Sequence, residues 1–213
     1  MTEFLGFPEQ AVRFYAELER NNTRAFWGAH KKEYDELVRA PMLALGDTLE
    51  AEFGPVKVFR PNRDVRFSPD KSPYKTYQGA IAGRDAGIGY YVEISASGLL
   101  VGGGYHSHSS AQVQRYRRAV DEDAAGSRLH QIVTGLRSAG FDLEGGRLKT
   151  APRGYARDHP RLELLQFTSL MALKRFGTPG WLGSPKTLDR VRVTWQAIRP
   201  LTEWITRHVG AAP

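Results

Sequence analysis

The sequence contains no cysteine and no long hydrophobic run. Without cysteine, the chain forms no disulfide, offers no thiolate to a metal or an iron–sulfur cluster, and has no cysteine nucleophile. No window approaches the 18 consecutive apolar residues that mark a membrane-spanning helix. The first residues also lack the basic region and apolar run of a secretory signal. We therefore expect a soluble, cytoplasmic protein that does not use a membrane as its partner.

Common catalytic signatures are missing as well. There is no dinucleotide-binding fingerprint, no H-E-x-x-H and no G-x-S-x-G, and residues 183–187 end in Lys-Thr without the glycine spacing of a P-loop. Two S-x-x-K matches, at Ser68 and Ser72, contain prolines that disfavour the helical turn needed to bring the lysine beside the serine. We expect no cofactor, and the sequence leaves open whether the protein is an enzyme.

Positive charge is abundant but unevenly distributed. The 213 residues carry a net charge of +7, with 41% hydrophobic and 25% charged residues, as is typical of a soluble globular domain. Residues 1–56 hold six basic and ten acidic residues, a net charge of −4, which leaves +11 for the remainder. A basic remainder favours anionic partners. The oligomeric state is not determined by the sequence.

Hydrophobic periodicity predicts helices at both ends and strands between them. Helical spacing runs through the first fifty residues, with Pro41 as a break or kink, and Gly54-Pro55 ends this part. Short runs rich in β-branched and aromatic residues then predict strands, and helical spacing returns further on. The predicted strands cover residues 56–59, 77–82, 90–95 and 99–101, and the predicted later helices cover 110–123, 127–138 and 185–208.

This order predicts an α+β fold: a central antiparallel sheet with N-terminal helices, further helices inserted after the sheet strands, and a C-terminal helix that Pro200 kinks or splits. A hairpin is expected over 141–149, and a short helix followed by a strand over 164–176. We expect a single domain, 1–213, with a helical part (1–55), a sheet with a basic loop (56–104), and a mixed part with the C-terminal helix (105–213).

The most informative stretch is residues 57–75, KVFRPNRDVRFSPDKSPYK, which we call the basic segment. It has six basic and two acidic residues and three prolines, so most of it is expected to be loop. Such a loop is able to present several donors to a phosphate or carboxylate. Asp64 and Asp70 would orient those donors or act as a base. The candidate ligand-binding residues here are Arg60, Arg63, Arg66, Lys71, Tyr74 and Lys75.

The run from Arg60 to Lys75 resembles the signature of a family of conserved hypothetical proteins, catalogued as domain of unknown function 2461. Further similar stretches follow in the same order along nearly the whole chain, among them residues 4–7, 21–27, 101–104, 152–155 and 158–160. The family is mostly bacterial, with some fungal members. The resemblance implies one domain spanning the chain, and it supplies no reaction, substrate or catalytic residue.

A second loop, residues 149–160, is rich in basic and aromatic residues. Arg153 and Tyr155 are candidate ligand-binding residues, and His159 beside Asp158 is a candidate for acid–base chemistry near neutral pH. The alternative is that Asp158 caps a helix beginning near Pro160 and that His159 is an ordinary surface residue.

Two histidines provide a weak metal-binding pattern. His106 and His108 would share one face of an extended chain, but a third ligand would have to come from elsewhere, for example His159 or Asp64. We therefore do not predict a metal site.

Three interpretations of the basic residues remain open. The first is a pocket for a small anionic or phosphorylated ligand, formed by the basic segment with Arg153 and His159 across a cleft. The second is a nucleic-acid-binding module, favoured by the +11 remainder with interleaved aromatic residues. The third is purely structural: the Arg/Asp/Lys segment is an internal clasp that joins the helical N-terminal part to the sheet, so that replacing Arg63 or Asp64 lowers stability.

Overall fold

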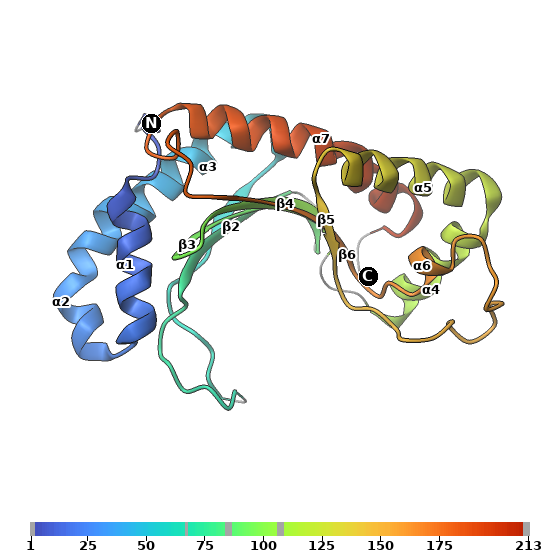
Figure 1. The fold of residues 1–213 in the computed structure, drawn as a ribbon, viewed down its shortest axis with the longest axis horizontal. Helices are drawn as coiled ribbons and strands as arrows, with labels where there is room; N and C mark the ends of the chain where they lie inside the picture. The colour runs from blue at the N-terminus through green and yellow to red at the C-terminus, as the bar shows by residue number, and fades with distance from the viewer. Residues whose placement is uncertain (1–2, 67, 84–86, 106–108, 211–213) are drawn as a thin grey trace. The chain divides into compact units, whose positions relative to one another are not determined.

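A computed structural model of the protein describes residues 3–66, 68–83, 87–105 and 109–210. The fold is α+β with a six-stranded antiparallel sheet, as predicted (Figure 1). In spatial order the strands are β1 (Val56–Val58), β2 (Tyr77–Ala82), β3 (Ile88–Ser95), β4 (Gly98–Tyr105), β6 (Leu170–Gly177) and β5 (Asp142–Glu144).

Helices precede the sheet, interrupt it and close the chain. Within the described residues, no helix combines the length and the apolar character that crossing a membrane requires. The helices are α1 (Glu9–Arg20), α2 (Arg24–Tyr34), the π-helical turn η1 (Asp35–Arg39), α3 (Ala40–Phe53), α4 (Ser110–Asp121), α5 (Asp123–Ser138), α6 (Leu162–Leu165) and α7 (Lys186–His208).

The chain forms two compact units. Unit 1 comprises residues 1–82, 91–101 and 175–193, and unit 2 comprises residues 83–90, 102–174 and 194–213. Strands β3, β4 and β6 and helix α7 contribute residues to both units.

The helices of unit 1 pack through aromatic side chains. In α1 the buried residues recur at helical spacing, and the ring of Phe14 lies 6.0 Å from that of Trp27 on α2 in an edge-on arrangement. Thr23 starts α2 by accepting a hydrogen bond from the Phe26 N–H, as an N-cap residue does. The turn between these helices is thereby fixed close to a buried tryptophan.

Pro41 does not end the helical run. It lies at the start of α3, and the preceding turn η1 is π-helical, with the Ala40 N–H donating to the carbonyl of Asp35. A proline lacks an N–H and crowds the carbonyl four residues before it. The wider π-turn accommodates that defect, so α2 and α3 are joined without a loop.

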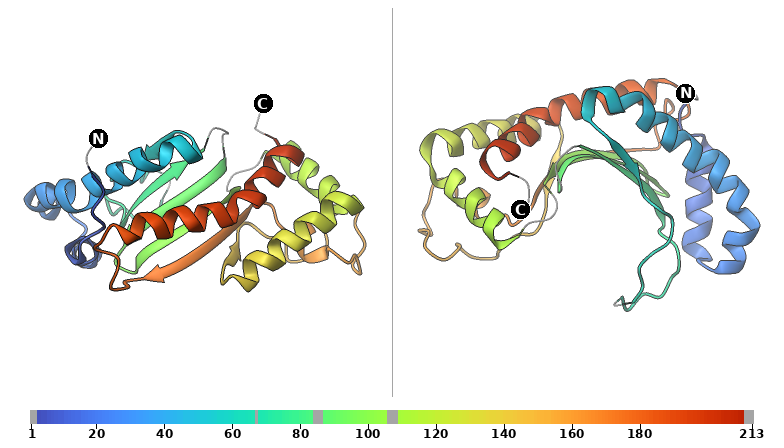
Figure 2. Two further views of the ribbon diagram at one scale, coloured as in Figure 1. Left: turned by 90° about the horizontal axis from the view of Figure 1, so that it is seen from above. Right: turned by 180° about the vertical axis from the view of Figure 1, so that it is seen from behind.

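The two faces of the sheet differ in unit 1. Helix α3 packs along β1 and β2 (Figure 2). Alternate residues of β2 and β3, such as Ala80 and Val92, are buried, whereas Tyr77, Tyr91 and Glu93 are only half-buried. Since successive strand residues point to opposite faces, these three side chains lie on the face opposite to the buried set.

The structure corrects the hairpin predicted over 141–149 and decides one of the two outcomes expected at Pro200. Strand β5 pairs with β6, with Leu143 opposite Ala172, so the hairpin predicted over 141–149 is wrong. Local turn residues suggested that hairpin, whereas the true partner lies about thirty residues away along the chain. Helix α7 is a single element that includes Pro200, so of the two outcomes expected there, a kink or a split, the split does not occur.

Candidate functional site

The basic segment forms a long extension of the β1–β2 hairpin. Val58 pairs with Ala80, and further out Asn62 forms an antiparallel bridge with Tyr74. Two backbone hydrogen bonds close this second ladder: Arg63 N to Pro73 O at 2.9 Å and Lys75 N to Pro61 O at 2.8 Å. The two arms of the segment therefore lie side by side beyond the strands (Figure 1).

Tyr74 ties the basic segment to the α1–α2 turn. The Asn22 side chain donates to the Tyr74 carbonyl at 2.9 Å and accepts from the Tyr74 N–H at 3.2 Å. The Tyr74 ring stacks on Trp27, with ring centroids 4.2 Å apart and planes 11° apart, and only 9% of the residue is exposed. The ring of Tyr74 is thus a packing element between the segment and α2.

The two aspartates of the segment are paired with arginines of the same loop. Asp64 accepts two hydrogen bonds from the Arg66 guanidinium, at 2.9 and 2.6 Å, and these bonds hold the pKa of Asp64 below its usual value. Asp70 pairs with Arg63 and accepts from Ser72 N at 2.9 Å. The bonds from Ser72, followed by the contact with Arg63, lower the pKa of Asp70 to about 2.

The lysines of the segment donate to backbone carbonyls. Lys75 Nζ donates to Arg60 O at 2.6 Å and to Asn62 O at 3.2 Å, and Lys71 Nζ donates to Val65 O at 3.0 Å. Partial burial and, second, the charge of Arg60 lower the pKa of Lys75. Arg60 itself is exposed, and its guanidinium has no hydrogen-bond or ion-pair partner among the described residues.

A shallow depression of about 350 Å³ lies at the base of the segment. It is lined by Arg63, Asp64, Lys75, Thr76 and Tyr77. The pKa of Tyr77 is raised, chiefly by burial and next by the negative charge of Glu93, while Arg63 acts in the opposite direction. The depression therefore combines two cations, one carboxylate that is already paired, and two hydroxyl groups.

Sequence reasoning did not single out Glu93. This half-buried glutamate on β3 accepts a hydrogen bond from the Tyr91 hydroxyl. Burial raises the pKa of Glu93 more than the Tyr91 bond and Arg175 lower it, and burial together with Glu93 raises the pKa of Tyr91. The available signal was a charged residue within an otherwise apolar and aromatic strand.

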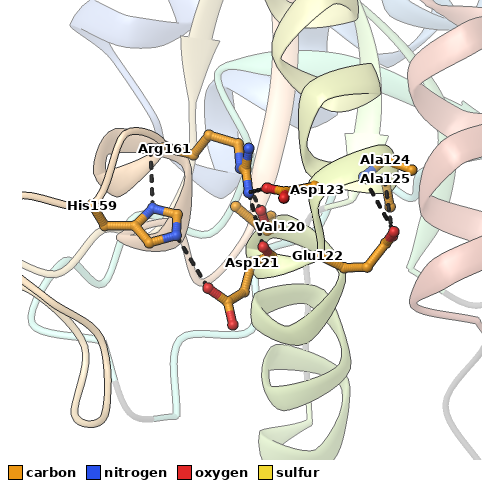
Figure 3. A network of polar contacts seen from close by, with 8 residues as sticks. All are labelled: Val120, Asp121, Glu122, Asp123, Ala124, Ala125, His159 and Arg161. Carbon is orange, nitrogen blue, oxygen red and sulfur yellow. Dashed lines mark hydrogen bonds and ion pairs between the residues drawn. The ribbon is translucent and has the colours of Figure 1, made fainter.

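His159 belongs to a network at the corner between α4 and α5 (Figure 3). Its Nδ1 accepts the Arg161 N–H at 3.0 Å, which places the ring proton on Nε2, 3.1 Å from Asp121 Oδ1. Both ring nitrogens are thus engaged by the protein, and only 14% of the side chain is exposed. Asp158 is exposed, and α6 begins at Leu162 with Arg161 rather than Asp158 as its cap residue.

Arg161 closes the same corner. Its Nε donates to the Val120 carbonyl and its Nη2 to the Asp121 carbonyl, both at 2.8 Å, and Nη2 also pairs with Asp123 at 3.0 Å. A cation beside the last carbonyls of α4 complements the negative end of that helix. Glu122 caps the start of α5 by accepting hydrogen bonds from the N–H groups of Ala124 and Ala125. This network holds α4, α5 and the 149–160 loop together.

The other candidate residues of the 149–160 loop are Arg153 and Tyr155. Arg153 is exposed and Tyr155 half-buried, and burial raises the pKa of Tyr155. The 149–160 loop lies in unit 2 and the basic segment in unit 1, so a shared cleft stays a prediction. His106 and His108 lie outside the described residues, within which no cluster of three or more His, Asp or Glu side chains suits a metal ion.

A model of the conserved hypothetical protein family DUF2461 matches residues 10–204. The chain belongs to this family. No curated protein and no solved structure matches the chain. The DUF2461 match includes the basic segment, Glu93 and the His159–Arg161 network, whereas residues 4–7 of the predicted resemblance precede it.

Proposed function

We propose that this DUF2461 protein binds a small anionic ligand, such as a phosphorylated metabolite, at the depression bordered by the basic segment. The observation that carries the proposal is one concave surface lined by Arg63, Lys75, Thr76 and Tyr77, together with Asp64, whose carboxylate is paired with Arg66. A guanidinium offers paired donors to a phosphate or carboxylate, and an ammonium offers a compact charge. A volume of about 350 Å³ suits a small molecule.

The electrostatics of Lys75 support this proposal. Its pKa is lowered by partial burial and by Arg60, so its positive charge is less favourable here than in an exposed lysine. A bound anion next to the ammonium would favour the charged form and raise that pKa again. Arg60, whose guanidinium makes no hydrogen bond or ion pair with the described residues, adds positive potential beside the same lysine.

The aspartates are assigned a positioning role. Asp64 is held by Arg66 and Asp70 by Arg63 and Ser72, and both carboxyl groups have lowered pKa values. A carboxylate with a lowered pKa is a poor base at neutral pH. Its better use is to fix an arginine in one orientation, as Asp70 does for Arg63 on the wall of the depression.

A nucleic acid is the less favoured ligand because three of the tyrosines that would stack on bases, Tyr74, Tyr90 and Tyr105, are buried, whereas Tyr91 is half-buried. Bases of single strands are commonly held by exposed aromatic rings. The clasp interpretation is also less favoured for Arg63 and Asp64, since their ion pairs are made within the loop, and Asn22 and Trp27 make the contacts with the helices instead.

The test is calorimetric titration of inorganic phosphate into the wild-type protein and Lys75→Gln. Loss of a charged hydrogen bond should weaken binding about tenfold or more. Lys57→Gln is the matched control, since it removes one positive charge from the same segment but from an exposed strand residue that does not line the depression. Equal weakening in both variants, or no binding by the wild-type protein, would refute the proposal.

A further inference from the structure

We propose that the ligand site continues from the depression along the half-buried face of β2 and β3 to Glu93, and that the ligand is a phosphorylated sugar or polyol whose hydroxyl groups donate hydrogen bonds to this carboxylate. This inference rests on the proposed function and names the class of ligand for the same site.

Glu93 has an acceptor that the protein leaves unused. The Tyr91 hydroxyl donates to Oε2 of Glu93, and no donor within the described residues reaches Oε1. Oε1 is not among the fully buried side-chain atoms that lack a partner in the described part of the chain, so water reaches it in the free protein. A ligand hydroxyl group would take the place of that water.

Tyr91 is held in place by the sheet beneath it. A Cβ added at Gly79 would lie 2.9 Å from the Tyr91 hydroxyl oxygen and 3.0 Å from the Phe59 ring, so the tyrosine lies directly over a glycine. The rings of Phe59 and Tyr91 have centroids 6.3 Å apart. A side chain at position 79 would displace the hydroxyl that orients Glu93, which makes Gly79 part of the arrangement.

Tyr77 connects the depression to Glu93. It lines the depression, and it lies on the same face of β2 as Gly79. Gly79 lies against Tyr91, and because β2 and β3 are neighbouring antiparallel strands, Tyr77 and Glu93 lie side by side on this face. Same-face residues of adjacent strands lie about 4.5–8 Å apart. A molecule with a phosphate at one end and hydroxyl groups a few bonds away fits that spacing.

The depression at one end of this site and Glu93 at the other are chemically complementary to such a ligand. Arg63 and Lys75 would hold the phosphate, the rings of Tyr77 and Tyr91 would lie beside the carbon skeleton, and Glu93 would accept from hydroxyl groups. A carboxylate repels a bare phosphate and attracts a hydroxyl donor. With the phosphate group held at Arg63 and Lys75, only the hydroxyl groups of an ester would extend to Glu93, so Glu93 favours hydroxylated esters over inorganic phosphate.

The experiment compares inorganic phosphate with ribose 5-phosphate, glucose 6-phosphate and glycerol 3-phosphate by calorimetric titration. The wild-type protein should bind at least one of the three phosphate esters about tenfold or more tightly than inorganic phosphate. Glu93→Gln, which keeps the size of the side chain, should abolish that preference by weakening the ester. It should leave the binding of inorganic phosphate equal or stronger, because a negative charge is removed. Glu19→Gln, at an exposed position of α1, is the control and should change neither.

The outcomes separate the two proposals. If inorganic phosphate binds and depends on Lys75, but no ester binds more tightly, the extended site is refuted and the anion site stands. If Glu93→Gln retains the preference for the ester, the extended site is likewise refuted. If neither inorganic phosphate nor any ester binds the wild-type protein, both proposals fail. Thermal unfolding of Glu93→Gln close to the wild-type midpoint assigns any loss of preference to recognition rather than to folding.

Discussion

Replacing Asn22 with alanine tests how the basic segment is held against the helices. This side chain makes two hydrogen bonds to the backbone of Tyr74, through its amide nitrogen at 2.9 Å and its oxygen at 3.2 Å. It thereby satisfies both backbone polar groups of one residue, much as a neighbouring strand would. Alanine removes both bonds and leaves the N–H and the C=O of Tyr74 without these partners beside a buried ring.

The magnitude follows from the two groups left unsatisfied. An unpaired buried donor or acceptor costs about 1–3 kcal/mol. Asn22 is half-buried, so water reaches part of the site, and the lower part of that range applies to each group. The expected loss in the free energy of unfolding is about 2–4 kcal/mol, which for a chain of this length lowers Tm by about 4–16 °C.

The measurement is urea unfolding and thermal unfolding of Asn22→Ala beside Asn21→Ala. Asn21 is the exposed neighbour, and its side chain accepts only from the exposed Thr23 hydroxyl, so its replacement should change stability by no more than about 0.5 kcal/mol. Hydrogen exchange adds a local measurement, because the Tyr74 amide should lose protection in the Asn22 variant. Equal stabilities of the two variants, with the Tyr74 amide still protected, would refute the reasoning.

Three further predictions concern other parts of the molecule. Gly126→Ala should lower stability by about 1–3 kcal/mol, because the added methyl group meets a backbone carbonyl of α4, whereas Gly135→Ala in the same helix has open space and should raise stability by about 0.5–1 kcal/mol; urea unfolding that gives both substitutions the same sign would contradict this. Hydrogen bonds from Ser72 and the pairing with Arg63 lower the pKa of Asp70 from 3.8 to about 2, so ionised Asp70 stabilises the fold above pH 3.8 and this contribution is lost as the pH falls toward about 2. The stability difference between wild type and Asp70→Asn, measured by urea unfolding, should shrink over that interval, and a constant difference would argue against the assigned bonds. Finally, fluorescence titration with duplex DNA should show no tight binding at 150 mM salt; binding that weakens steeply with salt, with a log–log slope of about −0.9 per phosphate contacted, would restore the nucleic-acid interpretation.

Local patterns in the sequence were sufficient for most elements but not for their partners. The spacing of apolar residues predicted helices over 110–123 and 127–138, close to the observed α4 and α5. It did not predict that β5 pairs with β6, because strand pairing depends on segments far apart in the chain. Turn residues at 144–146 indicated a local hairpin, and only the completed sheet shows which edge was vacant.

The composition of the sequence was sufficient to locate the candidate site but not to predict its geometry. Prolines and clustered arginines identified the basic segment as a loop, and the backbone bridge from Asn62 to Tyr74 agrees with an extension between two strands. Nothing in the spacing indicated that Tyr74 would stack on Trp27 or that Glu93 would lie near Tyr77. Those contacts join residues brought together only by the packing of α2 and the alignment of β2 with β3.

The net charge of the basic segment does not show how many of its charged side chains are already bound to groups of the protein. Its net charge of +4 comes from six basic and two acidic residues. Both aspartates form ion pairs with Arg63 and Arg66, and two lysines donate hydrogen bonds to carbonyl groups of the segment itself. A hydrogen bond to a neutral carbonyl group does not cancel the charge of a lysine. The positive potential of the segment therefore persists while the lysine side chains become ordered. That combination, fixed donors with uncompensated charge, is what distinguishes a site able to select one small anion from a mobile basic loop that attracts any polyanion. It also explains why Glu93 matters to the proposal: positive potential attracts phosphates in general, and discrimination among them requires a group that only the hydroxyl groups of a longer ligand would reach.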